Sequence, residues 1–275
     1  MPKTLLPKDA TVAALLEELA AIDGLLASLD DEDWRRPTAL PGWDVQANVA
    51  HIVGTESILA GVPTPPITID VTDLPHVRND IGGMNEPWVL ALAPLAPAEM
   101  RDQLRAIVEQ RTAALLAMTQ DEWDAEGFTP AGMDSYGRFM RIRVFDCWMH
   151  EQDIRDAVGR PGHLDGAPVE LMLDEMATAM GFVVGKRAGA PDGARVTLSL
   201  IGETDRDIHV AVDGRAAVVP SLDGPAWVVL TTDVHTFSRL AGGRTTWAAI
   251  DPDLVTVEGD PALAETILRN LAYTI

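Results

Sequence analysis

The sequence is poor in cysteine and in basic residues. Its 275 residues include one cysteine, Cys147, so no disulfide can form within the chain, and we expect the reducing environment of the cytoplasm. The 21 Lys and Arg residues face 42 Asp and Glu residues, which gives a formal net charge of −21. A field of this sign repels nucleic acids and anionic lipid surfaces, and no Lys/Arg-rich stretch offsets it. Neither nucleic acid nor membrane is therefore expected as a partner.

The sequence also lacks long apolar runs. No window approaches the roughly 18 apolar residues that a membrane-spanning helix needs. The first ten residues, MPKTLLPKDA, lack the apolar core of a secretory signal. Hydrophobic residues still make up 47% of the chain, enough for a proper core. These features predict a soluble cytoplasmic protein with one large or two small domains.

Helical periodicity dominates the first part of the chain. It predicts four amphipathic helices, at residues 9–29, 44–60, 97–118 and 136–158. Asp44 is a plausible N-cap, Pro97 stands near the start of its helix, and Gly159 ends the last one. Residues 61–97 are rich in proline and predict a long connection with some helix after Val77. Four helices in this order predict an up-down bundle.

After Gly162 the pattern changes to short β-rich runs mixed with helices. Strands are predicted at residues 196–201, 208–212, 216–219, 227–231 and 255–257, and helices at 168–187, 234–241 and 261–271. Such a mixture is typical of a small α+β domain. We therefore predict a helical domain at residues 1–163 and an α+β domain at residues 164–275.

Three residues on two predicted helices could form a metal site. Asp146 and His150 are four residues apart, so one helical face carries both. His51 lies in the middle of the second predicted helix among small or apolar neighbours, where a buried imidazole needs a partner. If the two helices face each other, two imidazoles and one carboxylate converge and leave the fourth position of a zinc site open. Sequence spacing alone does not show that His51 lies near Asp146 and His150. A histidine within a helix is more often an ordinary core residue.

Short segments in both parts of the chain carry a family resemblance. They are PGWDV at 41–45, AHIVGTE at 50–56, RVFDCWMHEQDIR at 143–155, and VEGDPALA at 257–264 together with residues 270–275. The first three resemble the two metal-binding motifs of the mycothiol-dependent maleylpyruvate isomerase family, and the last is similar to the C-terminal module of that family. The resemblance implies a DinB-like four-helix bundle followed by a domain related to sterol-carrier-protein folds.

The resemblance also implies a chemistry. It implies that His51, Asp146 and His150 bind one divalent metal, most simply zinc, with mycothiol as co-substrate. Asp146 stands where the isomerase has Glu, which is one methylene longer. The implied activity is that of an isomerase or S-transferase, in which a metal-activated thiolate attacks a small electrophilic substrate. A hydrolase that uses metal-activated water, and a non-catalytic small-ligand-binding protein, stay open as alternatives.

Arg244 is the candidate catalytic residue of the second domain. It follows a short predicted helix and two glycines, which allow a sharp turn and a close approach to another surface. The resemblance implies an arginine at this position near the metal cleft, where its planar fork suits a substrate carboxylate. One alternative is that Arg244 is an ordinary surface cation at the end of a helix. Another is that Arg239, in the same segment, takes this role in its place.

Two further residues lie next to the predicted metal ligands. Cys147 lies about 100° around the helix from Asp146, so we expect it to pack in the core rather than to act as nucleophile. Asp153, three residues after His150, is either an acceptor for an imidazole N–H or the partner of a nearby arginine.

Overall fold

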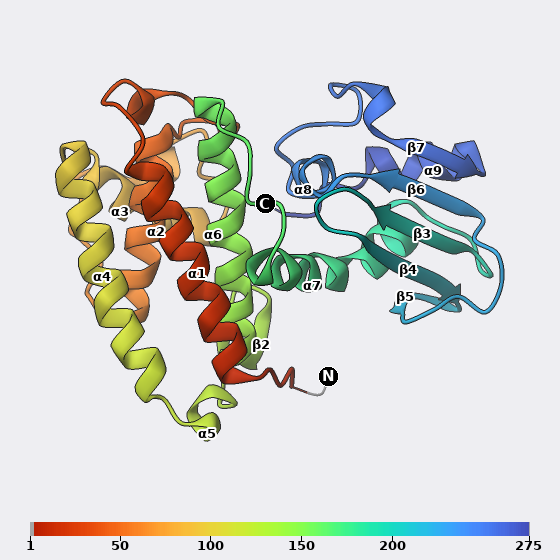
Figure 1. The fold of residues 1–275 in the computed structure, drawn as a ribbon, viewed down its shortest axis with the longest axis horizontal. Coiled ribbons are helices and arrows are strands. Elements are labelled where there is room, and N and C mark those ends of the chain that lie inside the picture. Colours follow the sequence, from red (N-terminus) through yellow and green to blue (C-terminus); the bar gives the residue numbers. More distant parts are fainter. Residues whose placement is uncertain (1–2, 275) are drawn as a thin grey trace. The chain divides into compact units, whose positions relative to one another are not determined.

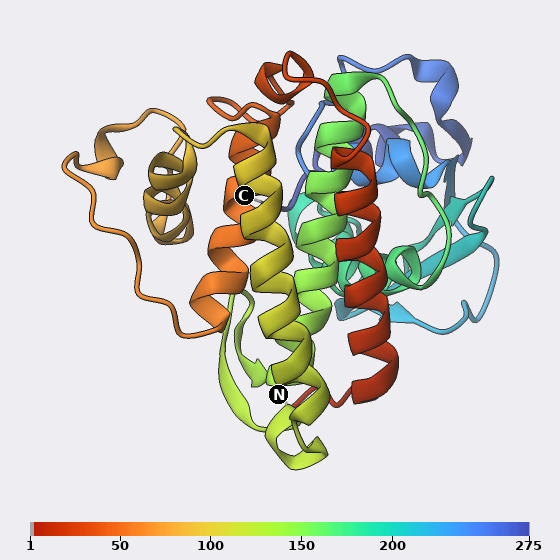
Figure 2. The same ribbon diagram turned by 60° about the vertical axis from the view of Figure 1, so that its left-hand side comes forward.

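The computed structural model describes residues 3–274, which divide into two compact units between Gly162 and His163. The first unit is helical and the second contains a five-stranded sheet, so the predicted fold class is confirmed. Figures 1 and 2 show the elements of each unit. Among the helices of residues 3–274, none combines the length and the apolar character that crossing a membrane requires.

The N-terminal unit contains the four long helices that the sequence predicts, together with shorter elements. Its elements are α1 (Lys8–Leu26), η1 (Asp33–Arg35), α2 (Val45–Leu59), η2 (Val71–Asp73), α3 (Asp80–Leu92), α4 (Pro97–Ala117), α5 (Gln120–Trp123), β1 (Glu126–Thr129), β2 (Gly132–Ser135) and α6 (Tyr136–Val158). The antiparallel hairpin of β1 and β2 was not predicted, because strands of four residues are too short to show a period.

The predicted alternation of helix direction is wrong at one place. Gln46, near the start of α2, donates to Leu95 O just before α4 at 2.9 Å, and Glu56 and Arg111, near the ends of these helices, pair at 2.9 Å. Helices α2 and α4 therefore run in the same direction, as Figures 1 and 2 also show. The connection between α2 and α3 returns the chain to the end where α2 began. Its roughly 20 residues can span about 60 Å when extended, which exceeds the length of helix α2, about 22 Å.

Local caps set the positions of the two helices that carry the predicted metal residues. Asp44 caps α2 by accepting from Ala47 N at 2.8 Å, as predicted. Ser135 caps α6 by accepting from Arg138 N at 3.0 Å. At the other end of α6, Gly159 adopts the left-handed conformation (φ 66°), which stops the helix at the predicted residue.

The buried faces of α1, α2, α4 and α6 form the core of the bundle. Apolar side chains from all four helices contribute to it, including Leu15, Ile52, Leu104, Met140 and Trp148. Helix α3 packs against α2 on the outside of this group (Figure 2). The polar residues of α2 and α6 described below lie within these largely apolar surroundings.

The C-terminal unit is a five-stranded sheet with helices. Its elements are α7 (Ala167–Phe182), a π-helical turn η3 (Val183–Arg187), β3 (Arg195–Leu200), β4 (Arg206–Asp213), β5 (Arg215–Val219), β6 (Val228–Thr232), α8 (Val234–Ala241), η4 (Pro252–Leu254), β7 (Thr256–Gly259) and α9 (Pro261–Arg269). The strand order is β5-β4-β3-β6-β7; β3 and β6 are parallel, and the other neighbours are antiparallel. Helix α7 packs against β4 and β5, and α9 packs against β6 and β7.

Candidate metal centre

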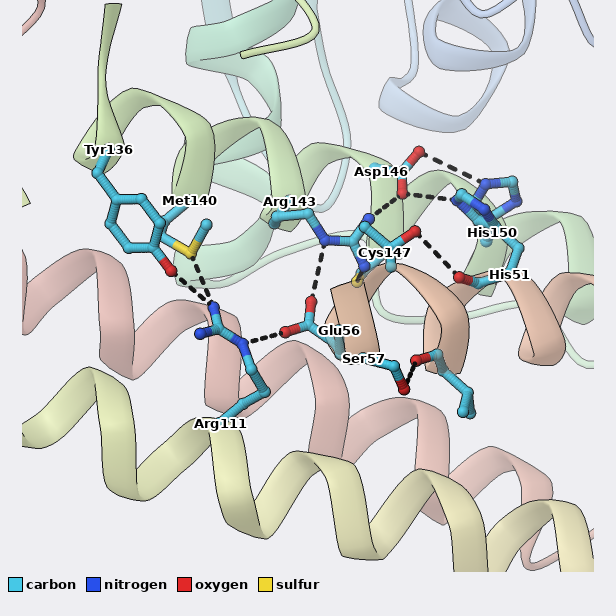
Figure 3. Close-up of polar contacts among 12 residues, drawn as sticks. His51, Glu56, Ser57, Arg111, Tyr136, Met140, Arg143, Asp146, Cys147 and His150 are labelled. Atoms are coloured by element: carbon cyan, nitrogen blue, oxygen red, sulfur yellow. Dashed lines mark hydrogen bonds and ion pairs between the residues drawn. The ribbon is translucent and has the colours of Figure 1, made fainter. Parts of the chain in front are cut away.

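The structure brings together the three residues that the sequence singles out. His51 comes from α2, and Asp146 and His150 lie one turn apart on α6 (Figure 3). His51 Nε2 lies 3.0 Å from Asp146 Oδ2, and His150 Nε2 lies 3.5 Å from Asp146 Oδ1. One potential ligand atom from each residue lies within 4.8 Å of the other two. One cation could therefore contact all three.

The cluster is buried on its imidazole side and open on its carboxylate side. The side chains of His51 and His150 are 5% and 7% exposed, whereas that of Asp146 is 29% exposed. Burial raises the pKa of Asp146, but His51, Arg143 and His150 outweigh it and hold this pKa well below its usual value. Burial lowers the pKa of His51 despite the opposing effect of Asp146. Asp146 is therefore ionised and His51 neutral at neutral pH, and these are the forms that bind metals.

The ring of His150 is oriented by hydrogen bonding. Its Nδ1 lies 2.7 Å from Asn48 Oδ1 and 3.5 Å from Asp153 Oδ2, and both oxygens are acceptors. The Asn48 amide is itself held, because its Nδ2 donates to Asp44 O at 2.9 Å and to Thr38 Oγ1 at 3.2 Å. Burial lowers the pKa of His150, but Asp146 and Asp153 outweigh it and raise this pKa. In the neutral imidazole the acceptors of Asn48 and Asp153 favour the proton on Nδ1, which leaves the lone pair of Nε2 facing the cluster.

Trp43 lies over both imidazoles. Its ring centroid lies 5.3 Å from that of His51 and 5.8 Å from that of His150. Its Nε1 donates to Glu86 Oε2 at 3.2 Å, and the same oxygen lies 3.1 Å from His76 Nε2. The long connection and α3 thus supply the groups that hold the aromatic wall of the cluster.

The donor set fits a zinc-type ion. Two imidazole nitrogens and one carboxylate oxygen are the ligands of many catalytic zinc sites, which keep a fourth position open. His51 Nδ1 is buried and has no hydrogen-bond partner among residues 3–274, so this ring is held only through its Nε2 side and its packing. The same ligands also suit nickel, iron or copper.

Two polar residues that contact the cluster were not predicted from the sequence as part of it. Asn48 lies three residues before His51, in a buried stretch of α2 that is otherwise mostly apolar. Arg143 donates from Nη1 to Asp146 Oδ2 and is 2% exposed. A buried polar side chain one turn from a candidate ligand is the signal that could have identified both.

The structure also defines the surroundings of Cys147. Cys147 is fully buried, burial raises its pKa well above the usual value, and Arg143 Nη2 donates to its Sγ at 3.3 Å. A buried neutral thiol is a poor nucleophile, which agrees with the packing role expected for Cys147.

Arg244 lies in the C-terminal unit just after α8, half-buried, with Nη1 donating to Gly242 O at 2.9 Å. Its part in catalysis stays a prediction.

Comparisons with solved structures support the fold. Crystal structures of the mycothiol-dependent maleylpyruvate isomerase and of its histidine-to-alanine mutant align with TM-scores of 0.55 and 0.58. Both are 19% identical to this chain, and each alignment covers 92% of this chain and 93% of the other. At this identity the likeness shows a shared fold.

Sequence comparisons define the family. Two uncharacterised proteins of Mycobacterium tuberculosis, from strains CDC 1551 and H37Rv, are each 25% identical over 151 residues, or 54% of this chain and 56% of theirs. The chain thus spans about half the length of the curated relatives it matches. Residues 15–155 match the family model of the mycothiol maleylpyruvate isomerase N-terminal domain, and residues 170–266 match that of the MDMPI C-terminal domain. With matches across both units, the chain belongs to the mycothiol maleylpyruvate isomerase family.

Proposed function

We propose that this protein is a metal-dependent, mycothiol-using isomerase or S-transferase, with His51, Asp146 and His150 as the metal ligands. The observation that carries the proposal is the convergence of these three donors from two helices, in a chain of this family. The related crystal structures are of an enzyme named for mycothiol and maleylpyruvate. The substrate class proposed here is accordingly a small electrophile, such as a conjugated carboxylate.

The metal and the protein would have separate tasks. Zinc bound at this site would act as a Lewis acid that favours the thiolate form of a thiol co-substrate. Asn48 keeps Nε2 of His150 available as a ligand, and ionised Asp146 offsets part of the metal charge. The partly exposed carboxylate side leaves an approach from solvent, while Trp43 shields the imidazoles from water.

The nucleophile would be the added thiol, because Cys147 is buried and neutral. In an isomerase, the thiolate adds to a conjugated cis double bond, the resulting single bond rotates, and the thiolate leaves again. In a transferase, it displaces a leaving group and remains attached to the product. Neither route changes the oxidation state of the protein, so no further redox partner is needed.

Metal analysis of purified protein tests the ligand assignment. We expect about one zinc-type ion per chain in the wild type and a severe loss in His150→Ala, because only two ligands remain. His209→Ala is the matched control, since His209 lies on β4 and pairs with Thr197 at 3.0 Å instead of joining the cluster. Equal metal content in His150→Ala and the wild type would refute the assignment.

Thiol dependence tests the reaction. With maleylpyruvate as the probe, the metallated wild type is expected to turn over only when mycothiol is added. Turnover of an ester or amide probe without any thiol would instead support the hydrolase alternative. Metal binding without turnover in either assay would favour a binding protein.

A further inference from the structure

A series of buried charged residues from α4, α2 and α6 leads to the candidate metal centre. Glu56 is fully buried, and Arg111 and Arg143 are 3% and 2% exposed. Glu56 Oε2 accepts from Arg111 Nε, and Glu56 Oε1 accepts from Arg143 Nε, each at 2.9 Å (Figure 3). Charges this deeply buried are stable only when they are paired and hydrogen-bonded.

The charges of this group balance only with the help of Asp146. One carboxylate and two guanidinium groups leave one positive charge in a buried environment. Arg143 Nη1 donates to Asp146 Oδ2, which supplies the missing negative charge. The carboxylate of the candidate metal centre therefore belongs to the buried network as well.

Arg143 is held at all three of its nitrogens. Its Nε contacts Glu56, its Nη1 contacts Asp146, and its Nη2 contacts Cys147 Sγ at 3.3 Å. A planar guanidinium bound on three sides has one orientation, so it meets the Asp146 carboxylate from one direction. The terminal torsion of an aspartate is otherwise soft, so an outside partner is needed to orient its two oxygens.

We propose that Arg143 is a positioning residue of the metal centre. It holds Asp146 so that Oδ2 faces His51 and Oδ1 faces His150, at the distances given above. Glu56, itself held by Arg111, keeps Arg143 in place. This inference rests on the proposed function, because it takes these three residues to be metal ligands.

Two effects of Arg143 on a bound cation oppose each other. The positive guanidinium repels the metal, whereas the orientation of the carboxylate favours it. Glu56 contacts Arg143 directly and, although it also pairs with Arg111, offsets part of the charge of Arg143. We expect the orienting effect to outweigh the remaining repulsion. Partners that orient a metal ligand typically change metal affinity by about 10- to 100-fold when removed.

The test compares Arg143→Gln with Arg111→Gln. Both variants remove one buried guanidinium from the same carboxylate, Glu56, but only Arg143 contacts Asp146. For each variant we would measure zinc dissociation constants by chelator competition, the visible spectrum of the cobalt-substituted protein, and urea unfolding. Zinc affinity should fall about 10- to 100-fold in Arg143→Gln, with an altered cobalt spectrum. Arg111→Gln should lose stability while keeping wild-type affinity, within about threefold, and the wild-type spectrum.

A second variant covers the case in which Arg143→Gln does not fold. Arg143→Lys keeps the charge but lacks the fork that reaches Glu56 and Asp146 together, so it should fold and still bind zinc about tenfold more weakly than the wild type. Equal changes in affinity for the Arg143 and Arg111 variants, or tighter zinc binding without Arg143, would overturn the positioning role. A wild-type protein that binds no zinc would overturn the proposed metal site itself, and these two failures are distinguishable.

Discussion

Asp146 and Cys147 are neighbours in the sequence and have opposite surroundings. The Asp146 side chain is 29% exposed and faces two imidazoles and a guanidinium, which hold its pKa well below the usual value. Cys147 is fully buried, and burial raises its pKa. One step along a helix turns a side chain by about 100°, enough to move it from the candidate metal centre to the core. The residue type and the face of the helix together decide which of the two can take part in chemistry.

Replacement of Cys147 by Ala tests this difference. We expect thiol-dependent turnover within about threefold of the wild type, because a buried neutral thiol does not supply the nucleophile. The free energy of unfolding should fall by roughly 1 kcal/mol through lost packing. Mycothiol-dependent turnover and urea unfolding are the measurements, with Cys147→Ser as a control that keeps a hydrogen-bonding atom near Arg143. Complete loss of turnover in a folded, metallated Cys147→Ala protein would make Cys147 the nucleophile.

At the scale of the elements, α2 depends on a close approach to α3. A Cβ atom on Gly54 would lie 2.5 Å from Trp88 Cβ and 2.6 Å from Trp88 Cγ, so only glycine fits without a shift. Gly54 is three residues after His51, on the helix that carries this candidate ligand. The spacing of the two helices therefore bears on the position of the candidate metal centre.

We expect Gly54→Ala to lower the free energy of unfolding by about 1–3 kcal/mol, because the added methyl group overpacks the helix contact. Gly24→Ala in α1 is the matched control, since nothing lies within 4 Å of a Cβ there. That control should be neutral or more stable by up to about 1 kcal/mol, because alanine favours helix. Urea unfolding measures both, and equal stability of the two variants would contradict the close approach.

Hydrogen bonds to Asp134 connect the segment before α1 with the start of α6. Its carboxylate accepts from Thr4 N at 2.7 Å, from Thr4 Oγ1 at 2.9 Å and from Arg138 Nη1 at 3.0 Å. Burial raises the pKa of Asp134, but the bonds from Thr4, Arg138 and Ser135 outweigh it and lower the pKa from 3.8 to about 2. A depressed pKa means that the ionised form stabilises the fold above pH 3.8, and that this stabilisation is lost as the pH falls toward 2.

Asp134→Asn should therefore lower the free energy of unfolding by about 2 kcal/mol at pH 7. The difference from the wild type should shrink as the pH falls below about 4, because the wild-type carboxylate then takes up a proton. Urea unfolding at pH 7, 4.5 and 3 measures this change, with the exposed Asp121→Asn as control. A difference that stays constant down to pH 3 would show that the ionised carboxylate is not what stabilises this contact.

At the scale of the whole molecule, the net charge of −21 disfavours an anionic substrate. Local cations must offset this field wherever a carboxylate-bearing substrate binds. Arg244 is the residue that the sequence and the family resemblance suggest for this role, and its planar fork can bind a carboxylate at two points.

Arg244→Ala is expected to keep the fold and the metal while turnover falls by at least about 100-fold, because the substrate is no longer oriented. Circular dichroism, metal content and turnover are measured separately. Arg239→Ala removes a cation from α8 itself and should change turnover far less. An unaltered rate in Arg244→Ala would remove this residue from the proposed site.

The sequence predicted most of the elements, and the failures have physical causes. The ends of α2 and α6 were predictable because Asp44 and Gly159 act locally, through hydrogen bonds and backbone conformation at the helix ends. The β1–β2 hairpin was missed because its strands are short, and the shared direction of α2 and α4 was missed because the path of a long connection depends on distant packing.

The candidate site also has one part that the sequence pattern predicts and another part that only the folded chain shows. The sequence pattern was enough to predict that Asp146 and His150 share a helical face, because the period of the helix brings residues four apart together. The folded chain was needed to show that His51, 95 residues from Asp146, meets this pair. It was also needed to show that Asn48 orients His150 and that Arg143 contacts Asp146. The reason is that helical periodicity relates residues within one helix, whereas the meeting of two helices depends on how all the buried faces of the bundle pack at once.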